Sequence, residues 1–165
     1  MLFRSGISDS AHLELWKQLD VPYFLRHDAQ ELAWQSRNLY NKVNSAQPVV
    51  RARWSPVGEG LQVLIYIRDQ PQLFARICGF FGSIGCNIID AKIHTTAHGY
   101  AIDTFQIMSG ATSNGYGEMI STIQRELSIA LAEQKPLPPP SRGGRISRQL
   151  RHFPIEPEVQ IRADE

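Results

Sequence analysis

The sequence is poor in cysteine and has no long hydrophobic run. Cys78 and Cys86 are its only cysteines among 165 residues, too few for a disulfide framework, so we expect two free thiols in a reducing compartment. No apolar stretch reaches the ~18 residues that a membrane-spanning helix needs. Polar residues directly follow the first four, which argues against a signal peptide. These features predict a cytoplasmic protein that does not enter a membrane.

The sequence also lacks an excess of either charge. Its net charge is +1, its charged residues make up 20% and its hydrophobic residues 42%. This composition is typical of a soluble globular protein, and the length allows a substantial buried core. A nearly neutral chain has no general attraction to nucleic acids or to membrane surfaces.

Familiar catalytic and metal-binding motifs are missing as well. There is no Ser/His/Asp arrangement, no phosphate-binding glycine loop and no His-Glu-x-x-His pattern. The dipeptide His27-Asp28 would need further converging ligands to hold a metal, and Asp28 is well explained as a helix cap. His94 and His98 are interpreted as surface residues, with a ligand contact as the alternative. We expect no catalytic residue and no metal site.

The first 46 residues show helical patterns. Apolar spacing predicts a helix over 11–19 that Pro22 ends. Asp28 followed by Glu31 predicts a second helix with a capping box. This segment carries more large apolar residues than it can bury alone. We expect it to pack on the following domain or on another part of the protein.

Strand and helix signals alternate from residue 49 onward. Residues 49–54 and 61–67 predict an antiparallel hairpin, and the continuous apolar run of 61–67 indicates a central strand. A helix is predicted over 71–84, with Pro71 in its first turn and Gly85 as a left-handed C-cap. The next strand begins at about Asn87.

A second hairpin follows, and its register depends on which side chains share a face. A three-residue loop over 97–99, with Gly99 in the left-handed conformation, keeps the apolar residues of both strands on one face. This register pairs Ile89 with Ile107, Ala91 with Phe105 and Ile93 with Asp103.

The remaining elements complete a βαββαβ order from residue 61. A helix is predicted over 116–132, a proline run over 136–140 stops it, and a last short strand covers 158–162. The fold class is α+β: a ferredoxin-like antiparallel sheet with two helices on one face, preceded by a helical segment and an extra strand. The basic run between helix and last strand is interpreted as a solvated linker, with docking to phosphate or an acidic partner as the alternative; it contains Arg142, Arg145, Arg148 and Arg151.

Some ferredoxin-like sheets bind RNA through aromatic residues on an open face. Here Phe105 is assigned to the face that the two helices cover. The segment 101–107 also lacks the basic and glycine residues that open such a motif. We therefore expect no binding of nucleic acid.

The loop Asp69–Leu73 is the candidate binding site. It joins a buried strand to a helix, and two interpretations remain open. Asp69 or Gln70 could simply cap the helix. Alternatively, backbone N–H groups at the helix start could meet the carboxylate of a small ligand while Asp69 meets its ammonium group.

The order of motifs resembles the ACT domain family. A strand, Asp-x-Pro-x-Leu, a helix, an Asn-Ile strand and a hairpin ending in Asp-x-Phe are its features. Three stretches, at 68–81, 90–105 and 148–159, further resemble the C-terminal region of bifunctional PII uridylyltransferase/uridylyl-removing enzymes. Residues 23–37 are similar to the passage in those enzymes from a hydrolase domain of the His-Asp type into the first ACT domain.

The resemblance implies a role in nitrogen regulation. Enzymes of this family add UMP to PII signal proteins and remove it in response to glutamine, which tandem ACT domains are thought to sense, and magnesium is the parent enzyme's expected cofactor. The chain would hold a lead-in from the hydrolase domain (1–46), the first ACT domain (47–135) and a linker with a strand leading to a second ACT domain (136–165). Alone it would have no catalysis and no cofactor.

The resemblance also implies ligand and partner contacts. A glutamine-like amino acid would contact Asp69, Gln70, Pro71, Gln72, Leu73, Phe74, Asn87 and Ile88. ACT loops often have glycine where this chain has Gln72, which argues against close approach of a ligand to the backbone there. The strand 158–162 would have no partner of its own repeat, so a homodimer through sheet edges is expected. A ligand-free interaction or dimerisation module is the alternative function.

Overall fold

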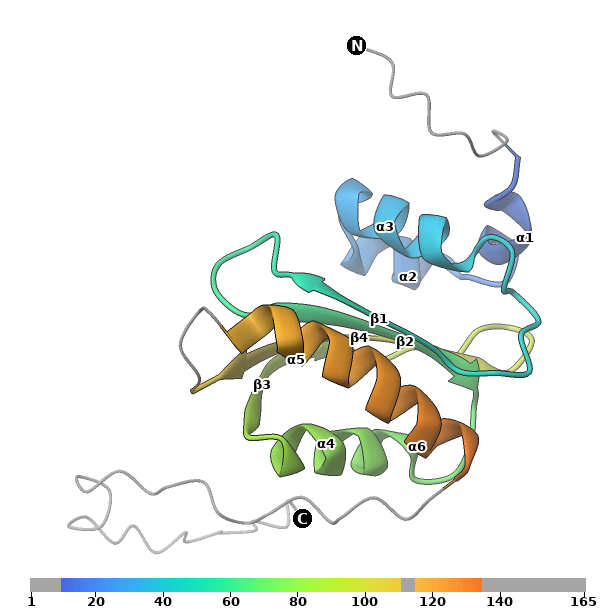
Figure 1. Cartoon of the computed structure of the whole chain (residues 1–165). Helices are drawn as coiled ribbons and strands as arrows, with labels where there is room; N and C mark the ends of the chain where they lie inside the picture. The colour runs from blue at the N-terminus through green and yellow to red at the C-terminus, as the bar shows by residue number, and fades with distance from the viewer. Residues whose placement is uncertain (1–9, 111–114, 135–165) are drawn as a thin grey trace, which may run out of the picture.

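A four-stranded antiparallel sheet lies between two layers of helices (Figure 1). The computed structural model describes residues 10–110 and 115–134. The strand order is β1-β2-β4-β3, with β1 (Val49–Trp54), β2 (Leu61–Arg68), β3 (Cys86–Lys92) and β4 (Tyr100–Ser109). One face carries α1 (Leu13–Trp16), α2 (Val21–Arg26) and α3 (Ala29–Leu39). The other carries α4 (Leu73–Ser83) and a longer helix made of α5 (Tyr116–Thr122), the π-helical turn Ile123–Leu127 and α6 (Ser128–Ala132). The predicted α+β, ferredoxin-like fold is confirmed.

Strand β2 forms the centre of the molecule, as its apolar run predicts. All of its residues except Arg68 are buried. Val63 and Ile65 belong to the core under α4 and α5, whereas Leu64 and Tyr66 belong to the core under α1–α3. Alternate side chains of β2 therefore pack against the two helical layers on opposite faces of the sheet. This is why the strand is apolar throughout.

The N-terminal helices cover the second face of the sheet. Leu15, Tyr23 and Leu39 pack with sheet residues in one buried cluster, so the expectation that this segment packs on the following domain is confirmed. The prediction that Pro22 ends a helix was wrong. Pro22 lies in the first turn of α2, where its missing N–H costs nothing, and Asp20 caps that helix by accepting from the N–H of Tyr23 (2.9 Å).

Asp28 caps α3, as the sequence predicts. Its carboxylate accepts from the N–H of Glu31 at 2.8 Å. The second half of the predicted capping box does not form, because the Glu31 carboxylate turns inward and bonds Gln62 and Lys92.

The β3–β4 hairpin has the predicted loop but a different register at its far end. Gly99 takes φ +82°, and Ala91 lies opposite Phe105. The pairing of Ile89 with Ile107 was wrong: Ile88 lies opposite Ile107, because a β-bulge inserts Ile89 between two paired residues. The bulge turns Ile89 outward, where it is 59% exposed.

The helices of the second layer follow the predicted spans with small changes. Helix α4 begins at Leu73, so Pro71 precedes the first turn that was predicted to contain it, and Gly85 (φ +73°) follows its end as predicted. The helix over 116–132 is present, with a π-helical turn that the sequence pattern did not indicate. The linker arginines and the strand 158–162 lie outside the described residues. Strand β1 pairs with one edge of β2, and β4 pairs with the other.

No helix within 10–110 and 115–134 combines the length and apolarity needed to cross a bilayer.

Candidate functional site

A small pocket opens between the β2–α4 loop and the β3–β4 hairpin. Its volume is about 240 Å³. The loop side is formed by Asp69, Gln70, Gln72, Leu73 and Phe74, and the hairpin side by Ile93, Thr95, Ala101 and Asp103. Each side thus contributes one carboxyl group and apolar side chains to a space of the size of a small metabolite.

Five of the eight expected contact residues line this pocket. They are Asp69, Gln70, Gln72, Leu73 and Phe74. Pro71 lies within the same loop but does not line the pocket. Asn87 and Ile88 lie at the start of β3, opposite Met108 and Ile107. The pocket lies at the other end of the hairpin. The structure does not bring these two residues to the pocket.

The start of α4 has no side-chain cap. Neither Asp69 nor Gln70 caps it, contrary to one of the two sequence interpretations: the Asp69 carboxylate accepts from the N–H of Gln70 (2.9 Å), outside the helix. The N-cap position is Gln72, whose side chain makes no capping bond. Uncapped N–H groups at a helix start favour an anion such as a carboxylate.

Gln72 adopts a left-handed backbone conformation, with φ 60° and ψ 16°. Glycine reaches this conformation at less cost than residues with a side chain. The loop therefore has the backbone shape that glycine would favour at this position, although glutamine stands there.

Asp103 supplies a buried carboxyl group to the pocket. Its side chain is only 1% exposed, and its Oδ1 accepts from the backbone N–H of His94 at 3.3 Å. Burial raises the pKa of Asp103 to about 7, and the nearby charge of Asp69 adds to the rise. The sequence analysis placed Asp103 on the core-facing side without assigning it a role. A charged residue at a core-facing strand position was the available signal.

Replacing Asp103 with asparagine should stabilise the protein at high pH. The pKa of the folded state, about 7, lies above the ordinary value of 3.8. The stability that the neutral carboxyl contributes is therefore fully present below 3.8 and is lost as the pH rises through 7. A shift of this size corresponds to about 4 kcal/mol, and solvation through the pocket reduces it. We expect Asp103→Asn to gain about 2 kcal/mol at pH 8 and little at pH 4. Urea unfolding of both proteins at the two pH values measures the difference.

Asp90 provides the matched control for this measurement. It is an exposed aspartate on β3 of the same hairpin. Asp90→Asn should change the free energy of unfolding by less than about 0.5 kcal/mol at either pH. A gain for Asp103→Asn that does not depend on pH would contradict the assignment.

The tip of the hairpin is bound to the N-terminal helices. The N–H of Ala97 donates to the carbonyl of Gln18 (2.9 Å), and His98 Nε2 lies 2.9 Å from the carbonyl of Val43. Arg26 donates to His94 Nδ1 at 3.4 Å. His94 and His98 are partly exposed, and both rings also connect the hairpin to the N-terminal segment, which the surface interpretation did not include. Sequence reasoning missed this because the partners lie far away along the chain.

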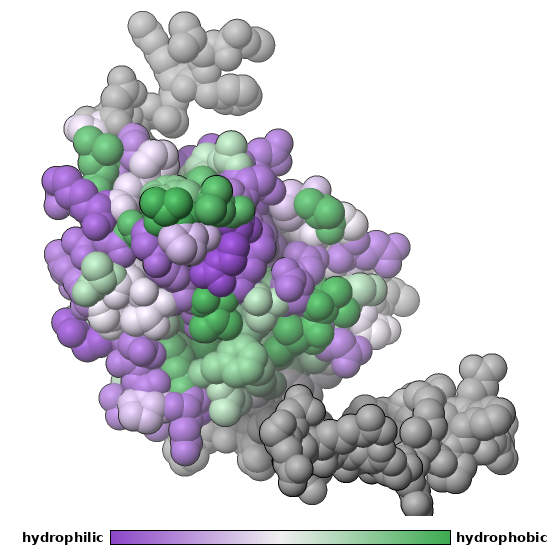
Figure 2. Space-filling view, turned by 180° about the vertical axis from the view of Figure 1, so that it is seen from behind, coloured by the Kyte–Doolittle hydropathy of each residue, from purple (hydrophilic) through white to green (hydrophobic). Residues whose placement is uncertain are grey.

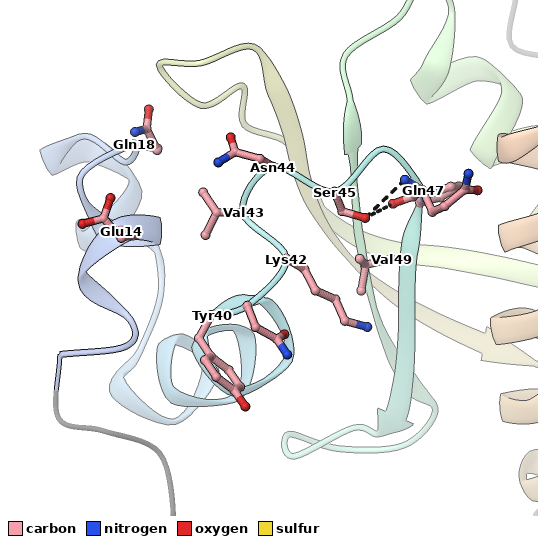
Figure 3. A pocket seen from close by; sticks show the side chains of 11 residues that line it. Glu14, Gln18, Tyr40, Lys42, Val43, Asn44, Ser45, Gln47 and Val49 are labelled. Atoms are coloured by element: carbon pink, nitrogen blue, oxygen red, sulfur yellow. Dashed lines mark hydrogen bonds between the residues drawn. The ribbon is translucent and has the colours of Figure 1, made fainter.

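A larger pocket lies between α1 and the connection from α3 to β1 (Figure 3). Its volume is about 580 Å³, and Glu14 of α1 and Gln18, which follows α1, face residues 42–45 across it. Glu14 already pairs with Lys17 at 2.6 Å on the surface. The pocket holds no buried titratable side chain, so it offers less specific chemistry than the pocket at Asp103.

The described part of the chain has no cluster of three or more His, Cys, Asp or Glu side chains that could hold a metal ion.

Comparison with known proteins supplies a family context. The family described as "Uridylyltransferase GlnD fifth domain" matches residues 1–38. A bifunctional uridylyltransferase/uridylyl-removing enzyme of Cupriavidus pinatubonensis is 55% identical over 92% of this chain, and one of Ralstonia nicotianae is 53% identical over 100% of it. A third, of Burkholderia vietnamiensis, is 49% identical over 96% of the chain. The chain spans 18%, 20% and 18% of these three relatives, respectively, which is about a fifth of their length.

Proposed function

Because this chain corresponds to a segment of the bifunctional uridylyltransferase/uridylyl-removing enzymes, we propose that it is an ACT module that senses an amino acid, glutamine, for such an enzyme. The observation that carries the proposal is the pocket at the β2–α4 loop. It places an uncapped helix start and two carboxyl groups around a space of about 240 Å³. An amino acid carries both charges that such a pair of features favours.

The arrangement of the hairpin supports a regulatory role. Its inner side chains, such as Thr95 and Asp103, line the pocket. His94 lies between these residues and the helices. Its N–H donates to Asp103 Oδ1, and its ring Nε2 lies 3.8 Å from Oδ1 of Asp20. A ligand that moves the pocket wall would thereby act on α1 and α2. These helices belong to residues 1–46, the proposed lead-in from the hydrolase domain.

The proposal also covers the activity of the whole enzyme and the place of this chain within it. The parent would uridylylate PII signal proteins and remove the group again in the cytoplasm, with magnesium at its active sites. Residues 47–135 would be its first ACT domain and residues 136–165 the lead-in to a second. This chain would contribute sensing and no catalytic residue.

A ligand-free interaction module is the second candidate, and the position of β3 at the edge of the described sheet favours it. Strand β3 is an edge strand with Ile89 exposed at the bulge, whereas Gln124 accepts from the N–H of Ala52 on the opposite edge strand, β1. Exposed strand edges favour pairing with another copy. Viewed from behind, hydrophobic side chains gather in separate areas, at the level of α1–α3 and of the sheet (Figure 2).

Calorimetric titration of L-glutamine into the chain tests the proposal. We expect saturable binding at millimolar glutamine. Gln70→Ala, which alters the pocket wall, should weaken it about fivefold or more. Gln18→Ala, in the pocket between α1 and β1, is the matched control and should bind normally. Absence of binding by the unaltered chain would contradict glutamine sensing. A dimer seen by sedimentation under those conditions would instead favour the interaction module.

A further inference from the structure

We propose that Asp103 receives the ammonium group of an amino acid bound in the pocket between the β2–α4 loop and the hairpin. The inference rests on the proposed sensing function and adds a contact residue that lies outside the loop. Asp103 belongs to β4, and its carboxyl group forms part of the hairpin wall of the pocket.

The described residues satisfy the carboxyl group of Asp103 only in part. Oδ1 accepts the long 3.3 Å bond from His94, and no donor among the described residues reaches Oδ2. The residue is nevertheless buried, with 1% exposure. An incompletely satisfied carboxylate is costly at such a position. An ammonium group that entered through the pocket would supply both the missing donor and the opposite charge.

The opposite wall of the pocket suits the other charge of an amino acid. Helix α4 presents N–H groups that no side chain caps, at the positive end of its dipole. Leu73 and Phe74 of its first turn and Ile93 of the hairpin supply apolar surface between the two polar ends. The pocket thus offers an acceptor for an ammonium group, donors for a carboxylate and a surface for methylene groups.

Asp103 is better placed than Asp69 to make the ammonium contact. Asp69 is exposed, and its Oδ1 already accepts from the N–H of Gln70. Ion pairs in water contribute little, whereas the same contact strengthens where water is excluded. Asp103 therefore determines the affinity for the ammonium group, and Asp69 contributes a smaller share.

The test compares two ligands and four proteins by calorimetry. The ligands are L-glutamine and 4-carbamoylbutanoate, which lacks the amino group. The proteins are the unaltered chain, Asp103→Asn, Asp69→Asn and the exposed control Asp90→Asn. We expect Asp103→Asn to weaken glutamine binding about 10- to 100-fold. It should leave the binding of 4-carbamoylbutanoate unchanged, while Asp69→Asn costs a few-fold and Asp90→Asn nothing.

Proton release gives a second readout. Besides burial, Asp69 on the loop raises the pKa of Asp103, and the N–H of His94, in the connection between β3 and β4, lowers it. Tyr23 of α2 also interacts with the charge of Asp103. Because the pKa of Asp103 is about 7, glutamine should displace about half a proton at pH 7 as the carboxyl ionises. Titrations in buffers with different ionisation enthalpies measure this release. It should persist in Asp69→Asn and vanish in Asp103→Asn.

Two results would overturn the assignment while sensing stands. One is equal glutamine affinity for the unaltered chain and Asp103→Asn, without proton release. The other is an equal loss of both ligands in Asp103→Asn, which would indicate a structural role. If the unaltered chain binds no glutamine, the sensing function fails and the Asp103 subsite fails with it.

Discussion

Replacing Glu31 with alanine should lower the free energy of unfolding by about 3 kcal/mol, because the change breaks a buried ion pair and leaves its partners unsatisfied. Glu31 projects from α3 and is 3% exposed. Its Oε2 accepts from Lys92 of β3 at 2.6 Å, and its Oε1 accepts from Gln62 of β2 at 3.1 Å. One carboxylate therefore ties a helix of the N-terminal layer to two strands of the sheet.

The polar network continues beyond Glu31, which increases the cost of losing it. Gln62 Oε1 accepts from Arg53 Nε at 2.8 Å, and the Arg53 guanidinium lies 4.0 Å from the centre of the Trp34 ring. Without Glu31 the Gln62 amide loses its acceptor inside the protein. The Lys92 side chain, 30% exposed, can still reach water. This relief keeps the expected loss near the lower end of the ~3–5 kcal/mol typical of a broken buried pair.

Glu14 makes a matched control, since it also pairs with a lysine at 2.6 Å. The Glu14–Lys17 pair is exposed, with side-chain exposures of 70% and 65%. Glu14→Ala should cost less than about 0.5 kcal/mol. Urea unfolding, read as a change of midpoint at constant slope, measures both variants. Equal losses in Glu31→Ala and Glu14→Ala would show that the network contributes no more than a surface pair.

The sequence could predict the parts of the fold that depend on neighbouring residues. Gly99 in a three-residue loop, Gly85 after α4 and Asp28 before α3 each act over a few positions, and the structure contains all three. The apolar run of β2 similarly reports that strand's burial on both faces. Local chemistry suffices in these cases because the interacting groups are close along the chain.

Features that depend on distant partners could not be predicted in this way. Glu31 matches a capping box, but Lys92, 61 positions later, draws its carboxylate inward. The bulge at Ile89 likewise depends on the partner strand, since the extra residue has no counterpart on β4. Asp103 joins the candidate site only because the hairpin folds against the loop before α4. The loop at 69–74 could be proposed from sequence, whereas its opposite wall could not.

Replacing Gly60 with alanine should lower the free energy of unfolding by about 3 kcal/mol or more, through a backbone clash combined with an unfavourable dihedral angle. Gly60 precedes β2 and has φ +100°. A Cβ atom at this position would lie 2.2 Å from the carbonyl oxygen of Ile107 on β4. Ile107 pairs with Leu61 in the centre of the sheet, so neither strand can move aside without breaking the ladder.

Gly58 separates the two causes, because it shares the dihedral problem without the clash. It lies in the same connection with φ +75°, and a Cβ there would meet nothing within 4 Å. Gly58→Ala should therefore cost only about 1 kcal/mol. The difference between the two variants in urea unfolding isolates the contact with Ile107. A difference below about 1 kcal/mol would mean that the β1–β2 connection relaxes around the new methyl group, so that the close packing of Gly60 against β4 contributes little to stability.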